Sequence, residues 1–99
     1  MTSPRPDDPR VLFMADTFFK SLVSATRAKE VSLYYYRREL EKQRATEQDL
    51  RRVSLIYAIH FIEGINKIKE SANADIGDKQ IQDLVVESIE YVKEKFKSE

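Results

Sequence analysis

Between Pro9 and Gly64 the chain contains neither glycine nor proline, so no residue in this long stretch is a strong helix breaker. The 99 residues include only 2 glycines and 3 prolines in all. That is too few for an all-β chain, which needs a turn about every ten residues. A chain of about 100 residues is long enough for one domain. The sequence therefore predicts a single all-α domain.

The first predicted helix has a clear start, because Asp8 can cap it and Pro9 occupies the first helical position. We expect it to run from about residue 9 to about residue 44 as one long helix. The alternative is a break near residues 24–27, where Ser and Thr cluster. Apolar residues recur at helical spacing along one stripe of this segment: Val11, Met14, Ala15, Phe18, Leu22, Ala25, Leu33, Tyr36 and Leu40.

A second helix is expected over about residues 47–72, with Thr46 as its cap and acidic residues in its first turn. Its middle is apolar on nearly all sides, so we expect it to be the central helix of the domain. Gly64 lies on its main apolar face and indicates a close helix crossing, since a glycine inside a helix costs about 1 kcal/mol.

A linker over residues 73–78 is rich in Asn, Asp and Gly, and Asp78 is the best cap for a third helix that ends near residue 97. Residues 1–8 are polar and hold two of the three prolines, so we expect a disordered tail. Residues 9–99 are expected to form one helical domain. The predicted architecture is an elongated three-helix bundle with a long first helix, or with that helix split in two.

The N-terminal part of the first helix carries more large apolar side chains than one narrow stripe can bury. In a bundle of three unequal helices this part would overhang the other two. Burying one phenylalanine contributes about 1.5–3 kcal/mol, so something should cover the overhang. The candidates are a second copy of the chain, a different protein, or a bend onto the chain's own core. We expect Phe13, Phe19 and Val23 to contact a partner.

A second candidate surface starts at three consecutive tyrosines, residues 34–36, which are followed by two arginines. Consecutive helix residues point about 100° apart, so the three tyrosines cannot all face the core. Tyr36 belongs to the apolar stripe, and at least one of the other two should be exposed. Tyrosine and arginine are enriched at the energetic centres of protein interfaces. The residues expected to form this polar and aromatic patch are Tyr34, Tyr35, Arg38 and Arg52.

The formal net charge is zero, with 17 basic and 17 acidic residues, which argues against a general polyanion binder. The charge is nevertheless polarised: residues 27–52 hold eight basic and five acidic residues, and residues 63–99 hold six and nine. A nucleic-acid-associated subunit of a larger complex is therefore the alternative function, although interleaved carboxylates would repel phosphate. It would use stretch 34–52, with Arg37, Arg38, Lys42, Arg44 and Arg51.

Catalytic and metal sites have little support in the sequence. The chain has no cysteine and one histidine, His60, so thiolate sites and sites that need two histidines are excluded. The two glycines, Gly64 and Gly77, are too far apart for a phosphate-binding loop. We expect His60 to be a boundary residue bonded to a carboxylate or to the backbone. The prediction is a protein that is not an enzyme and needs no cofactor or metal.

These observations favour a non-enzymatic protein-interaction module, such as an adaptor, an assembly factor or an inhibitor. It would present helix surfaces to another protein or to a second copy of itself. No apolar run approaches the ~18 residues of a membrane span. The N-terminus lacks the apolar segment of a secretory signal, so we expect an intracellular, cytoplasmic protein that does not contact membranes.

Overall fold

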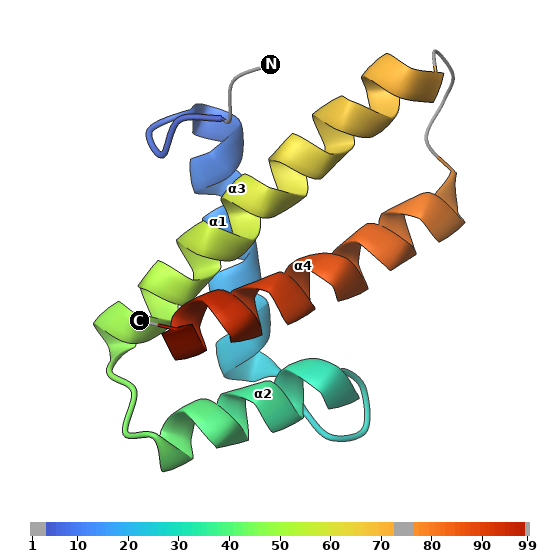
Figure 1. Cartoon of the computed structure of the whole chain (residues 1–99). Coiled ribbons are helices and arrows are strands. Elements are labelled where there is room, and N and C mark those ends of the chain that lie inside the picture. Colours follow the sequence, from blue (N-terminus) through green and yellow to red (C-terminus); the bar gives the residue numbers. More distant parts are fainter. Residues whose placement is uncertain (1–3, 73–76, 99) are drawn as a thin grey trace.

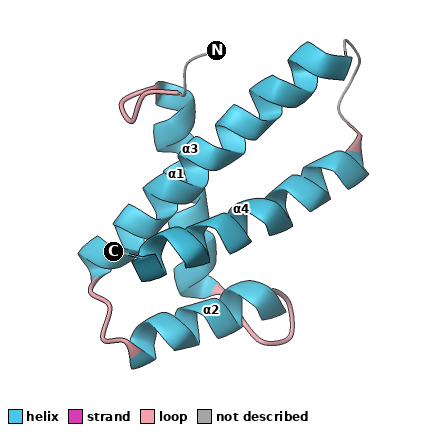
Figure 2. Cartoon of the chain, in the orientation of Figure 1, coloured by secondary structure: helices cyan, strands magenta, loops and turns pink. Residues whose placement is uncertain are grey.

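The structure, a computed structural model, describes residues 4–72 and 77–98, with side chains over residues 4–70 and 77–96. These residues form four helices (Figure 1): α1 (Pro9–Ser24), α2 (Val31–Lys42), α3 (Glu47–Ala72) and α4 (Asp78–Ser98). Short loops join α1 to α2 and α2 to α3, and the described part contains no strand (Figure 2). The all-α prediction is confirmed, and α3 and α4 match the second and third predicted helices. Residues 1–3 of the expected tail and 73–76 of the expected linker lie outside the described residues.

The prediction of one long first helix is wrong, and the alternative break is confirmed. Helix α1 ends at Ser24 because Ala25 adopts an extended conformation, with φ −60° and ψ 137°. Thr26 then organises a turn. Its carbonyl accepts a hydrogen bond from the Glu30 N–H (2.9 Å), and its hydroxyl accepts one from the Lys29 N–H (3.3 Å). Such bonds from Ser and Thr compete with helical bonding, so the chain leaves α1 here and restarts as α2.

Arg37 of α2 holds the two pieces of the broken helix together. Its guanidinium donates to the carbonyl oxygens of Leu22 (3.2 Å) and Val23 (2.8 Å) in the last turn of α1. These carbonyls lack helical partners and form the negative end of the helix dipole, so a cation is favoured there. The same guanidinium lies 3.4 Å from the Glu41 carboxylate. Arg37 thus fixes α2 against the end of α1.

The helix starts follow the sequence signals closely. The Asp8 carboxylate accepts from the Arg10 N–H (2.8 Å), and the bonds from Arg10 lower the pKa of Asp8. Thr46 and Asp49 bond reciprocally through their side chains and backbone N–H groups (2.9 and 3.2 Å), so aspartate closes a capping box that usually has Glu or Gln. At α4 the cap is Gly77, one residue before the expected Asp78, because the Gly77 carbonyl accepts a hydrogen bond from the Ile81 N–H (3.2 Å).

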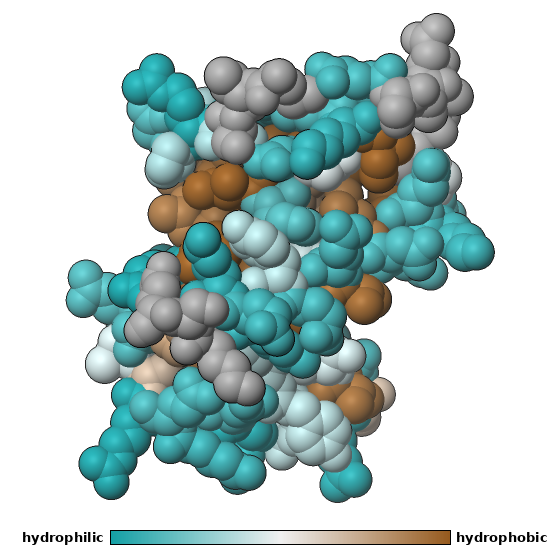
Figure 3. All heavy atoms as spheres, in the orientation of Figure 1, coloured by the Kyte–Doolittle hydropathy of each residue, from teal (hydrophilic) through white to brown (hydrophobic). Residues whose placement is uncertain are grey.

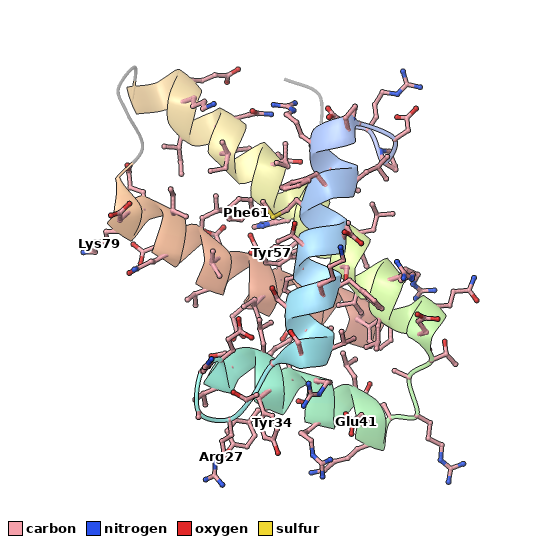
Figure 4. All side chains as sticks on the ribbon, turned by 180° about the vertical axis from the view of Figure 1, so that it is seen from behind. Arg27, Tyr34, Glu41, Tyr57, Phe61 and Lys79 are labelled. Carbon is pink, nitrogen blue, oxygen red and sulfur yellow. The ribbon has the colours of Figure 1, made fainter. Side chains whose placement is uncertain are left out.

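Helix α3 is central, as predicted, because both α1 and α4 pack against it (Figure 1). Figure 4 shows Tyr57 and Phe61 on α3 in the middle of the assembly. The Tyr57 ring stacks on Phe18 of α1, with 4.0 Å between ring centroids. Leu84 of α4 lies where a side chain at Gly64 would be, which confirms the predicted close crossing. The buried core is completed by Val11, Leu22, Tyr36, Leu40, Val53, Ala58, Ile62, Leu84, Ile89 and Val92.

The expected overhang of the first helix is absent. The chain turns at Ala25, and α1 packs across α3 (Figure 4) and buries Val11, Phe18 and Leu22. The radius of gyration is 13.7 Å, close to the about 13 Å of a 100-residue domain, and the extents are 42 × 29 × 23 Å. The fold is therefore a compact four-helix assembly and not the elongated three-helix bundle that we expected.

Candidate protein-interaction surfaces

Part of α1 stays uncovered after this packing. The Phe13 side chain is 73% exposed, and Leu12 and Val23 are exposed as well. We call these three residues the α1 apolar face. Phe13 and Val23 are accessible, as a partner-binding role would require. Phe19 is largely covered, at 9% exposed, because it packs against α3 once α1 turns back on the core. Only the part of its side chain that lines the groove between α1 and α3 remains open to a partner.

A shallow groove of about 230 Å³ runs between α1 and α3 beside the α1 apolar face. Arg51 stands over the buried Phe19 ring, with its guanidinium carbon 4.1 Å from the ring centroid. In Figure 3, apolar atoms gather where α1 meets α3, on a surface that is otherwise mostly hydrophilic. The groove can accept an apolar side chain from outside, with an arginine at its edge. Its lining is Leu12, Ala15, Asp16, Phe19, Arg51, Ser54 and Leu55.

The tyrosines divide as the helical geometry requires. Tyr36 is buried in the core, Tyr35 is 49% exposed, and Tyr34 is half-buried. The Tyr34 and Tyr35 rings meet edge to face, with centroids 5.4 Å apart. Arg27, from the turn before α2, lies 5.9 Å from the Tyr35 centroid, and Arg37 lies 5.4 Å from that of Tyr34. Figure 4 shows Arg27 and Tyr34 together at the α2 end of the molecule.

Two arginines that we expected in this patch have different surroundings. Arg38 forms an exposed ion pair with Glu41 (3.2 Å) on α2. Arg52 lies on α3 beside Phe96 of α4, with its guanidinium carbon 5.7 Å from the ring centroid. The tyrosine patch instead includes Arg27, which sequence reasoning missed. Its signal was the Ser and Thr cluster, because a break there places Arg27 beside the start of α2.

The arginines of the nucleic-acid alternative are largely engaged within the chain. Arg37 donates to α1 carbonyls. Arg51 stacks on Phe19 and lies 3.7 Å from Glu47. Arg38 pairs with Glu41, whereas Lys42 and Arg44 are exposed at the end of α2. Carboxylates thus lie among these cations, and no observation here favours binding to phosphate over binding to protein.

His60 occupies a second, larger groove. Its Nδ1 lies 2.8 Å from the Ser88 hydroxyl, its ring stacks on Tyr91 (4.3 Å between centroids), and its Nε2 lies 3.8 Å from Glu87. The closest partner is therefore a hydroxyl and not the carboxylate or backbone group that we expected. Ser88 was detectable as the polar residue in the apolar stripe of α4. It is fully buried, so it orients His60 and is out of reach as a nucleophile for an external substrate.

This histidine groove has a volume of about 470 Å³, between α3 and α4, and its walls are Ile56, Ile59, His60, Glu63, Lys67, Tyr91 and Lys95. Lys67 is paired with Glu63 at 3.2 Å. Among the described residues, no group of three or more histidine and acidic side chains is placed to hold a metal ion. Within the same part of the chain, no helix combines the length and apolar content needed to cross a membrane.

Comparisons with known proteins give no match: no protein-family model, no curated protein and no solved structure shows significant similarity to this chain. What the chain does must therefore be argued from its own surfaces.

Proposed function

We propose that the chain is a non-enzymatic protein-interaction module that binds a partner through the α1 apolar face. One observation carries the proposal: Phe13 is 73% exposed beside an exposed Leu12. Phe13 lies in the second turn of α1, past the capped start at Asp8, so its exposure does not come from a frayed terminus. Single exposed apolar residues are common, but adjacent large ones beside an apolar groove are typical of interaction sites.

The energetics of this face suit a partner helix. Covering one phenylalanine contributes about 1.5–3 kcal/mol, and the groove beside α1 can take an apolar side chain from the partner. Arg51 at the groove edge can bond a polar group on the partner helix. The partner is another protein, for which this chain acts as adaptor, assembly factor or inhibitor, or a second copy of the chain.

A matched pair of variants tests the proposal. Phe13→Asp places a charge in the centre of the face, and Gln82→Asp adds the same charge on the exposed side of α4. Both positions are exposed, so the free energy of unfolding of each variant should lie within about 0.5 kcal/mol of that of the original chain. Sedimentation and affinity capture from the host would then compare the three proteins.

We expect self-association, or a captured protein, to be lost with Phe13→Asp and kept with Gln82→Asp. If the Phe13→Asp variant associates and captures as the original chain does, the α1 apolar face is not the binding surface. If both variants lose association equally, the effect is one of charge alone, which also contradicts the proposal.

A further inference from the structure

The outer side of α1 carries exposed residues at the spacing of a coiled-coil seam. They follow one another at intervals of three, four and three positions, and we call them the α1 seam: Phe13, Asp16, Lys20 and Val23. On the helix they fall within about 80° of one another, opposite the buried Phe18. In Figure 4, α1 lies in front of α3, and its outer side faces the viewer. The α1 seam can therefore pack against a helix from outside.

The order of side chains along the α1 seam is complementary to itself when two copies run antiparallel. With position 18 at the centre of the contact, Phe13 of each copy lies opposite Val23 of the other. The same register places Asp16 opposite Lys20, because both pairs are centred on position 18. A parallel pair would instead place each of these charges opposite itself. Facing charges of unlike sign favour association and like charges oppose it, so the charges select the antiparallel arrangement.

The charged centre of the seam gains more from a second copy than it has alone. Within one chain, Asp16 and Lys20 form an exposed ion pair at 2.9 Å, and a pair of this kind contributes little to stability. Two antiparallel copies would bring four charges of alternating sign together, so each carboxylate would face an ammonium group on the other helix. A network of several charges is stronger than an isolated surface pair. The charges would thus fix the register, while Phe13 and Val23 supply apolar contact at both ends.

The hydroxyl groups beside the seam do not oppose its burial. The Thr17 hydroxyl donates to the Phe13 carbonyl (2.9 Å), and the Ser24 hydroxyl donates to the Lys20 carbonyl (2.7 Å). A polar group is costly to cover when it loses water and gains no partner. Because both hydroxyl donors are already bonded within α1, a second helix can cover them without leaving a donor unsatisfied.

We propose that the partner of the α1 apolar face is a second copy of this chain, bound through a two-fold symmetric, antiparallel pair of α1 helices. The inference rests on the proposed function, because it assigns the partner of the same face. A two-fold interface uses the same patch on both copies, so it requires one face that is complementary to itself. The contact joins two helices of 16 residues, which is small for an interface, so the dimer should be weak and depend on concentration.

Charge exchange tests the pairing, by sedimentation equilibrium of the full chain over a range of concentrations. Asp16→Lys places a second ammonium group opposite Lys20, and Lys20→Asp places a second carboxylate opposite Asp16. Each variant alone should associate at least about tenfold more weakly than the original chain. An equimolar mixture of the two should dimerise, because a cationic seam then faces an anionic one. Asp83→Lys is the matched control: it makes the same change in charge at an exposed position of α4 and should dimerise as the original chain does.

The double variant, Asp16→Lys with Lys20→Asp, reverses both signs and should dimerise again. Recovery in the mixture and in the double variant also shows that the single variants fold. Unchanged association of Asp16→Lys, or no recovery in either case, would overturn the antiparallel pairing. A chain that stays monomeric at every concentration would overturn the second copy as partner. If that monomer captures another protein and loses it with Phe13→Asp, the proposed function survives without this inference.

Discussion

Arg44 adopts an unfavourable backbone conformation that closes the C-terminal end of α2. Among the described non-glycine residues, Arg44 is the one with positive φ (60°), and it follows the last turn of α2. The Ala45 N–H bonds the Leu40 carbonyl (3.0 Å) and the Arg44 N–H bonds the Glu41 carbonyl (2.9 Å). This is the Schellman pattern, in which glycine is the preferred residue at the left-handed position.

Arg44→Gly should therefore raise the free energy of unfolding by about 1 kcal/mol, because glycine adopts positive φ without the steric penalty of a Cβ atom. Urea unfolding measures the change. Arg44→Ala, which keeps the Cβ atom, should bring no gain. A glycine variant less stable than the original chain would contradict this reading of the turn.

Tyr36→Phe should also stabilise the protein, by about 1 kcal/mol, because it removes a buried hydroxyl without a partner and keeps the ring in the core. The measurement is again urea unfolding. A loss of stability would mean that the hydroxyl makes a hydrogen bond in the folded protein.

At the scale of elements, Arg37 connects α2 to the last turn of α1. Arg37→Ala should lower the free energy of unfolding by about 2 kcal/mol, because two carbonyls at the end of α1 lose a charged donor. Arg38→Ala is the control: it removes an exposed pair with the same Glu41 and should change stability by less than about 1 kcal/mol. Equal losses in thermal melts of the two variants would contradict this role for Arg37.

The helices also show which parts of the fold could be predicted from the sequence. Helices α3 and α4 could be predicted because local caps and apolar stripes define them. The break at Ala25 could only be offered as an alternative, because the Ser and Thr signal does not force a break. The bonds from Arg37 to Leu22 and Val23, which hold the two helices together, come from the next helix. Since Phe19 is buried only if the break forms, its position could not be predicted either.

The surfaces also divide into features that local sequence determines and features that depend on contacts distant in sequence. Exposure of Phe13 and Tyr35 could be predicted from the width of a helical stripe, which is local information. The bond between His60 and Ser88 joins residues 28 apart in sequence. The burial of the Tyr36 hydroxyl without a hydrogen-bond partner depends on how α2 packs against the rest of the fold, which no local pattern encodes.

On the scale of the whole molecule, burial of tyrosines makes the free energy of unfolding fall at alkaline pH. Burial raises the pKa of Tyr57 to about 12, from an ordinary value of 10.0, and acts in the same direction on Tyr36. The unfolded chain loses these protons near pH 10, while the folded chain keeps them. Stability should therefore be constant below about pH 10 and fall as the pH rises toward 12.

For Tyr57 alone, each pH unit between about 10 and 12 should lower the free energy of unfolding by about 1.4 kcal/mol. Urea unfolding at about pH 8 and pH 11 measures the loss, and Tyr57→Phe should remove its share. Equal stability of the original chain at the two pH values would show that the tyrosines are not protected from ionisation.

The architecture as a whole leaves one side of α1 uncovered. Helix α3 receives α1 on one side and α4 on another, and the turn at Ala25 fixes α1 so that Phe13 points away from the core. Among the described residues, none of the other three helices lies over Phe13. On our account, a partner covers this face.

Site-specific photocrosslinking in the native host tests that claim most directly. Benzoylphenylalanine at position 13 should give an adduct of defined mass, either with one other protein or with a second copy of the chain. The same probe at the exposed position 83 of α4 should give little or none. No adduct from position 13, or equal adducts from both positions, would contradict the proposal that the α1 apolar face is a binding surface.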